Sequence, residues 1–319
     1  MSLIPIRLGV IGAGRWGQVL IRTILARTDL RLAWVASRNP ATRSLVPPET
    51  IVAEDWRTFQ EVDIEGVVIA SPPALHASML RLAINNAIPA FVEKPLTTRL
   101  DDARELADLA QRKQALVLID HTHLFQHGYA TLRNLVGEEG GLLAVRSEGG
   151  QPSHPREDVA VLWDYGPHDV AMCLDLLGRG ASVVSAAHVS VRRTPRGLGE
   201  DVRIALGWPG GEWAECVVGN LMPRKVRRFV AASELAVYVF DDLAETPLVR
   251  FPPLSCAGWP DGTGGGTPVP VSRELPLERA MARFAAGIRG DLTGHPEFGL
   301  ALGVDVVRVL AEADAFLGK

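Results

Sequence analysis

The first third of the chain alternates short apolar runs with amphipathic stretches of helical spacing. The apolar runs are bounded by polar or turn residues, which is typical of strands buried on both faces of a parallel sheet. The predicted strands are Ile6–Ile11, Leu32–Ala36, Gly66–Ala70, Ala90–Val92 and Ala115–Ile119. The helices predicted between them are Trp16–Ala26, Leu75–Asn85 and Asp101–Lys113. This alternation predicts an α/β domain with a doubly wound parallel sheet.

The rhythm changes after about residue 122, where closely spaced runs predict strands that are mostly antiparallel neighbours in one sheet. These strands are Ser182–Val191, Val202–Leu206, Trp213–Val218, Val226–Ala231 and Leu235–Phe240. The accompanying helices are Tyr129–Val136, His168–Leu177, Leu277–Ile288 and Leu300–Phe316. We therefore predict a Rossmann domain over 1–122 and an α+β domain with a large, mainly antiparallel open-faced sheet over 123–319. The last helix is expected to pack back on the first domain.

Composition excludes several classes of protein. The formal net charge of -4 over 319 residues leaves no electrostatic footprint for nucleic acid or an anionic membrane. Three scattered cysteines without CxxC spacing, Cys173, Cys216 and Cys256, predict neither a disulfide framework nor a zinc site. No apolar run approaches the roughly 20 residues of a membrane span, and the first strand begins too early for a signal peptide. We expect a cytoplasmic protein.

A glycine-rich run directly follows the first predicted strand and opens the first helix. Gly12 permits the tight turn, Gly14 lets the backbone approach a pyrophosphate, and Gly17 lets the helix pack closely on the sheet. The free amides and the positive dipole end of the helix would hold the diphosphate. The residues assigned to this dinucleotide site are Gly12, Gly14, Arg15, Trp16 and Gly17.

The end of the second predicted strand bears on the choice of cofactor. Enzymes that use NAD usually carry an acidic residue there, which bonds the ribose 2′-hydroxyl. This chain has Ser37 and Arg38 instead. A hydroxyl and a guanidinium suit a 2′-phosphate, so the sequence favours NADP over NAD. Alternatively, Arg38 stacks on the adenine, which would fit either cofactor.

Three further segments carry motifs. The first is Gly66–Pro73 with His76 shortly after it, the second is Phe91–Leu96, and the third is Leu162–Asp169. With the glycine run, they resemble the Gfo/Idh/MocA family, named for glucose-fructose oxidoreductase and inositol dehydrogenase. The resemblance covers essentially the whole chain. Its specific parts are the Glu-Lys-Pro element at Glu93 and the Asp-x-x-x-His element ending at His168. It implies an enzyme in which Lys94, Asp164 and His168 are catalytic.

Residue chemistry agrees with the roles that the resemblance implies. Lys94 follows a strand at its carboxyl end, where ligands bind in open α/β sheets, and can donate to a substrate oxygen. Glu93 would hold this lysine in place. Pro167 predicts a helix start, so His168 would lie in the first turn, where the dipole disfavours its protonated form. Asp164, outside that helix, would orient the ring. The alternative is a buried histidine satisfied by a backbone group.

Other residues at the strand ends have smaller expected roles. Ser71 and Pro72 would form a rigid edge against the nicotinamide, and Glu93 and Lys94 would also border the cofactor. His76 would either cap the next helix or bond the cofactor ribose. The residues assigned to the substrate are Lys94, His123, Tyr165 and His168.

Three closely spaced histidines raise the question of a metal site, but we do not expect one. His121 and His123 would share one face of a strand, with His127 close by. However, hydride transfer to a nicotinamide needs no metal, and the resembled family generally uses none. One of these histidines would instead line the substrate pocket.

Two features of the sequence bear on the substrate without specifying which molecule it is. A basic run, Arg224, Lys225, Arg227 and Arg228, would meet either a phosphorylated sugar or solvent at a sheet face. The family's paired glycines before the aspartate are replaced by Val159 and Ala160, and Ala171 replaces a second acidic residue.

The sequence therefore predicts an NAD(P)-dependent oxidoreductase that transfers hydride to or from a hydroxyl or carbonyl carbon of a sugar, polyol or related small molecule. The alternatives are a non-catalytic NAD(P)-binding sensor of the same fold and a reductase of an imine or bilin-like substrate. An exposed sheet face in the second half would need covering, which favours a homodimer or homotetramer.

Overall fold

The computed structural model describes residues 4–254, 258–260, 262, 264–291 and 300–318, so Cys256 lies outside the described residues. The chain divides into two compact units. The first unit comprises residues 1–121 and 277–304, and the second comprises residues 122–276 and 305–319.

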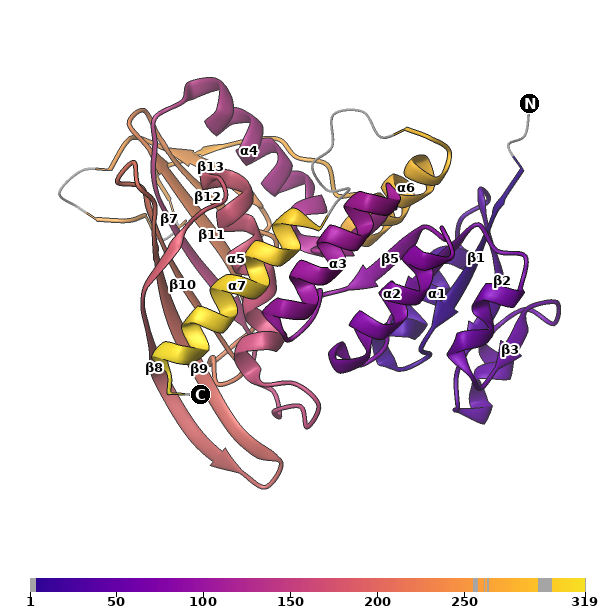
Figure 1. The fold of residues 1–319 in the computed structure, drawn as a ribbon. Coiled ribbons are helices and arrows are strands. Elements are labelled where there is room, and N and C mark those ends of the chain that lie inside the picture. The colour runs from indigo at the N-terminus through magenta and orange to yellow at the C-terminus, as the bar shows by residue number, and fades with distance from the viewer. Residues whose placement is uncertain (1–3, 255–257, 261, 263, 292–299, 319) are drawn as a thin grey trace. The chain divides into compact units, whose positions relative to one another are not determined.

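A six-stranded sheet with all neighbouring strands parallel forms the centre of the first unit (Figure 1). Its strands are β1 (Ile6–Ile11), β2 (Leu30–Ala36), β3 (Ile51–Ala53), β4 (Gly66–Ile69), β5 (Ala90–Glu93) and β6 (Val117–Asp120), in the order β3-β2-β1-β4-β5-β6. The helices are α1 (Arg15–Leu25), α2 (His76–Asn85), α3 (Leu100–Lys113) and α6 (Pro276–Ile288). This confirms the predicted doubly wound sheet. Only the short edge strand β3 escaped prediction.

The two-sided burial of this sheet explains its continuous apolar strands. In β4 and β5 every residue is buried, as a parallel sheet covered on both faces requires. Helix α6 packs closely because Gly66 has no side chain; a Cβ there would meet Ile288 at 2.9 Å. Phe284 of the same helix makes an edge-on contact with Phe91, their ring centroids 5.7 Å apart.

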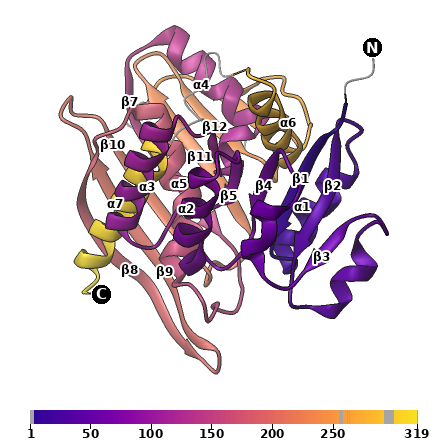
Figure 2. The same cartoon turned by 45° about the vertical axis from the view of Figure 1, so that its right-hand side comes forward.

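An eight-stranded sheet forms the second unit (Figure 2). Its strands are β7 (Leu142–Gly150), β8 (Ser182–Thr194), β9 (Gly197–Gly207), β10 (Trp213–Gly219), β11 (Val226–Ser233), β12 (Val237–Asp241), β13 (Leu248–Phe251) and β14 (Thr267–Pro268). Their order is β14-β13-β12-β11-β7-β10-β9-β8, and only the β7–β10 pair is parallel. The helices are α4 (His127–Glu139), α5 (Val161–Leu177) and α7 (Ala301–Phe316). This confirms the predicted, mainly antiparallel sheet.

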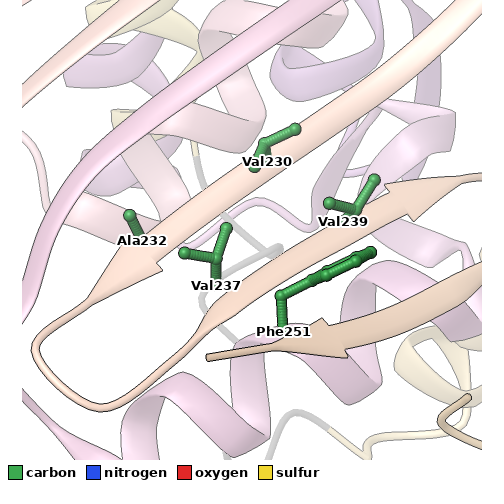
Figure 3. Packing of buried hydrophobic residues seen from close by; sticks show 5 residues of the cluster. All are labelled: Val230, Ala232, Val237, Val239 and Phe251. Carbon is green, nitrogen blue, oxygen red and sulfur yellow. The ribbon is translucent and has the colours of Figure 1, made fainter. Parts of the chain in front are cut away.

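The two faces of this sheet are covered differently. On one face Tyr129 of α4 makes an edge-on contact with Phe229 of β11. Val230, the next residue, points to the opposite face, where it joins a buried apolar cluster (Figure 3). The members of this cluster are Val230, Ala232, Val237, Val239 and Phe251, with Val249 and Trp259 packed against them. Trp259, from the segment after β13, therefore covers part of the face that α4 does not reach.

Helix α5 differs from its predicted extent. It begins at Val161, so Pro167 lies inside the helix instead of opening it. A proline ring normally disfavours helical backbone in the preceding residue, but that residue is Gly166, which has no Cβ to clash. A side chain there would also meet Leu310 of α7 at 2.8 Å. Gly166 thus allows both the continuous helix and its contact with α7.

A buried carboxyl group, Asp169, fixes α5 against β7. Ser147 of β7 donates a hydrogen bond to it, and Gly149 leaves the room that its oxygens occupy. Burial raises the pKa of Asp169 to about 6, and the bond from Ser147 offsets part of that rise. Among the described residues, none of the helices combines the length and apolarity that crossing a membrane would require.

Asp169 should make the stability of the second unit depend on pH. Because its folded pKa of about 6 exceeds the unfolded value of 3.8, the unfolded chain releases the proton first as pH rises. The free energy of unfolding should therefore fall by up to about 3 kcal/mol between pH 4 and 6. Urea unfolding at several pH values measures this loss, which the variant Asp169→Asn should lack. Parallel pH profiles for the two proteins would contradict the assignment.

Candidate functional site

The glycine turn has the shape that a dinucleotide requires. Gly12 has a φ of +99°, and a Cβ there would meet the Ala70 carbonyl oxygen at 2.5 Å, so only glycine fits. A Cβ on Gly17 would collide with the Gly12 carbonyl oxygen. At Gly14, by contrast, a Cβ would meet nothing within 4 Å. The turn is closed on its protein side and open where a diphosphate would lie.

The start of α1 offers backbone amides to an anion. Its N-cap residue, Gly14, has no side chain to bond these amides, and no acidic residue occurs in the first turn. Helix starts of this kind bind phosphates through free N–H groups and the positive dipole end. Arg15 is exposed beside them and adds a positive charge. The turn and helix start therefore fit the diphosphate of a dinucleotide cofactor.

Ser37 and Arg38 lie directly after β2, at the same edge of the sheet. The Ser37 hydroxyl oxygen accepts hydrogen bonds from the Asn39 amide at 3.1 Å and the Thr42 hydroxyl at 2.8 Å. Ser37 thus shapes its loop and keeps its own O–H to donate. The side chain of Arg38 is exposed and can reach an anionic group in solution.

His76 has neither of its two predicted roles. Its side chain is fully buried, and its ring nitrogens lie 2.9 Å from the Pro95 carbonyl oxygen and 3.0 Å from that of Ser71. Burial lowers the pKa of His76, so the ring is neutral. A neutral imidazole has one N–H, so it donates a hydrogen bond to one of these two carbonyl oxygens. The buried ring neither caps α2 nor faces a ribose; it packs between the loop after β4 and the turn after β5. The sequence offered one signal for this position: His76 lies along the chain between the two loops that it contacts.

Lys94 and its neighbours end strand β5. Lys94 is partly buried and follows Glu93, the last residue of the strand. Glu93 is buried and accepts a hydrogen bond from the indole N–H of Trp16. Asp120, the last residue of β6, lies opposite Glu93 in the sheet register. Glu93 thus contacts α1 and β6 in addition to the charge of Lys94 that it was predicted to hold.

Helix α5 in the second unit carries Asp164, Tyr165 and His168. Asp164 lies within the first turn of the helix and His168 beyond it, so the predicted positions of both were wrong. The helix dipole therefore stabilises the Asp164 carboxylate and does not act on His168. Asp164 and His168 are four residues apart, which puts both on one face of α5. That spacing, unlike the helix start, was readable from the sequence.

The loop before α5 supplies partners that the sequence did not reveal. Arg156 bonds both oxygens of Asp158, at 2.9 and 2.7 Å, and reaches Asp164 at 3.4 Å. The hydroxyl groups of Ser153 and Tyr165 are 2.9 Å apart. These contacts fix the exposed face of α5 next to its two candidate catalytic residues.

The three histidines after β6 do not share one face. The strand ends at Asp120, and His123 lies in the 3-10 helix η4 (Thr122–Phe125), so the strand face that His121 and His123 were expected to share does not form. The ring of His123 stacks on that of His168, with centroids 4.2 Å apart and an interplanar angle of 20°. His127 instead contacts Glu274 at 3.1 Å. Within the described part of the chain, no three His, Cys, Asp or Glu residues are grouped to hold a metal.

The basic run before and within β11 has mixed surroundings. Arg224 and Lys225 precede the strand and are exposed. Arg227 forms an ion pair with Asp242, and Arg228 lies 3.9 Å from Glu148. Two of the four positive charges therefore face carboxylates within the second unit.

Comparison with known proteins agrees with this geometry. Residues 6–121 match the family described as "Oxidoreductase family, NAD-binding Rossmann fold". The crystal structure of an oxidoreductase from Magnetospirillum magnetotacticum is 38% identical, with a TM-score of 0.89, covering 97% of this chain and 99% of that one. The chain belongs to the Gfo/Idh/MocA family of oxidoreductases.

Two curated relatives have more specific names. Inositol 2-dehydrogenase of Rhizobium meliloti is 25% identical over 227 residues, which cover 67% of this chain and 68% of the relative. The dTDP-3,4-didehydro-2,6-dideoxy-alpha-D-glucose 3-reductase of Saccharopolyspora spinosa is 27% identical over 168 residues, 51% of each chain. The matches span about half the length of the first curated relatives.

Proposed function

We propose that the protein is an NAD(P)-dependent dehydrogenase or reductase that acts on a hydroxyl or carbonyl carbon of a sugar, polyol or related small molecule. One observation carries the proposal. In the six-stranded sheet, an anion-binding glycine turn follows β1 and Lys94 follows β5, so both lie at the carboxyl edge of the same sheet. The named activities of the two curated relatives, an inositol dehydrogenase and a dTDP-sugar reductase, support this substrate class.

The chemistry divides between the cofactor and the chain. When bound, the nicotinamide supplies the hydride acceptor or donor. Lys94 donates a hydrogen bond to the substrate oxygen, which stabilises negative charge there. His168 takes the proton of that oxygen during oxidation and returns it during reduction. The Asp164 carboxylate favours the imidazolium that forms on its face of α5.

The residues proposed to hold the cofactor follow the strand ends. Gly12, Gly14 and Gly17 shape the cradle, Arg15 adds charge, and Ser37 and Arg38 meet the adenosine ribose. An exposed guanidinium without a nearby acidic residue in its loop favours a 2′-phosphate, and NADP is therefore the preferred cofactor. Trp16 and Glu93 support the cradle, while Ser71 and Pro72 form the edge beside the nicotinamide.

Replacement of Lys94 or His168 by alanine should lower turnover by about 10²-fold or more, because each loses a proton or hydrogen-bond contact made in the transition state. Cofactor affinity should change little. If both groups act on one substrate oxygen, the double variant should lose far less than the product of the two single effects. Absorbance of NAD(P)H across a panel of sugars and polyols measures this. Cofactor binding without turnover on any panel member would favour a sensor.

Arg38→Ala should weaken NADPH binding about tenfold, because the bond to the 2′-phosphate is charge-assisted. NADH, which lacks that phosphate, should lose little affinity. Energy transfer from the protein's tryptophans to the bound nicotinamide measures both dissociation constants. Arg31→Ala, at an exposed position of the preceding strand β2, is the matched control. Equal loss for both cofactors would point to adenine stacking.

We also propose a homodimer or homotetramer. Three valines of β8 are about half exposed or more, Val184 at 63%, Val189 at 50% and Val191 at 51%, and apolar strand surface of this kind is usually covered by a second chain. Sedimentation velocity should show an oligomer that Val189→Asp weakens or splits. A monomeric native protein would refute this.

A further inference from the structure

Two acidic side chains lie next to each other inside the first unit. Glu93 and Asp120 end adjacent parallel strands and are partners in the register of β5 and β6. Glu93 is 8% exposed and Asp120 is fully buried. Two carboxylates at such a place would repel each other without the hydration that normally stabilises them. The charge of Asp120 and hydrogen bonding to it both raise the pKa of Glu93, and a hydrogen bond between two carboxyl groups requires a proton on one of them.

The surroundings identify the group that keeps the proton. The indole N–H of Trp16 can only donate, so Oε1 of Glu93 acts as the acceptor of that hydrogen bond. Burial, followed by the negative charge of Asp120, raises the pKa of Glu93 well above its ordinary range. The Lys94 charge and the Trp16 bond offset this only in part. These effects favour the protonated form of Glu93.

We propose that Glu93 is an uncharged positioning residue that accepts a hydrogen bond from Trp16 and donates one to the Asp120 carboxylate. The three side chains form a chain of hydrogen bonds from the first turn of α1 to the ends of β5 and β6. Trp16 is the second residue of α1, so this chain anchors the helix start beside the glycine turn. The pair also carries one negative charge instead of two at an edge suited to a diphosphate.

The protonation of Glu93 does not depend on the proposed function; its effect on cofactor binding does. Infrared spectroscopy separates the C=O stretch of a protonated carboxyl group from the bands of carboxylates. At pH 8, where Asp169 with its pKa of about 6 is ionised, the native protein should show a protonated-carboxyl band that Glu93→Gln removes. Glu105→Gln, which changes an exposed carboxylate paired with Arg81, is the matched control and should leave the band unchanged. A band that survives Glu93→Gln, or is absent from the native protein, would overturn the inference.

Cofactor affinity tests the positioning role. Glu93→Ala should weaken NADPH binding about tenfold, because Trp16 and Asp120 both lose a buried partner. Glu93→Gln keeps an acceptor for Trp16 and a donor for Asp120, so it should recover most of that loss. If glutamine is as damaging as alanine, a charged Glu93 is needed and the inference fails. Should the alanine variant not fold, the infrared result still decides the protonation.

The two sets of outcomes are separate. Normal turnover in the Lys94 and His168 variants would contradict the proposed function and leave the infrared band unchanged. Conversely, a missing band would refute the neutral Glu93 while leaving hydride transfer intact.

Discussion

The close approach of α1 to the turn before it governs the first unit. A side chain at Gly17 would collide with the Gly12 carbonyl oxygen, and one at Gly12 with that of Ala70. These contacts press the helix start against the ends of β1 and β4, so its amides lie at the carboxyl edge of the sheet. The capacity of this edge to bind an anion therefore comes from backbone atoms, and side chains only refine it.

Buried polar groups then join the loops of that edge to one another. The neutral ring of His76 lies between the carbonyl groups of Ser71 and Pro95 and donates to one of them, and Glu93, beside Asp120, accepts a hydrogen bond from Trp16. Losing one partner in such a place leaves the others unsatisfied away from water, which costs more than the bond itself contributes. The loops after β4 and β5 are thus held in place before any ligand binds.

The sequence predicted what local patterns control. Apolar periodicity located five of the six parallel strands, and the glycine spacing located the turn. Prediction from the sequence failed where the local structure depends on contacts between residues that are far apart along the chain. Pro167 is typical of a helix start, but Gly166 lets it lie inside α5 and also leaves room for Leu310 of α7. The Glu93–Asp120 pair depends on strand register, which no single run of residues specifies.

The true extent of α5 changes how His168 can work as a base. In mid-helix, the dipole no longer keeps its imidazole neutral. At that position the ring of His123 stacks on that of His168, with centroids 4.2 Å apart, so this contact and not the helix start holds the imidazole in place. Asp164, one turn earlier on the same helix face, supplies the negative charge that an imidazolium formed on the proposed base would need. The base proposed for this site is therefore positioned by side chains from two elements, α5 and η4.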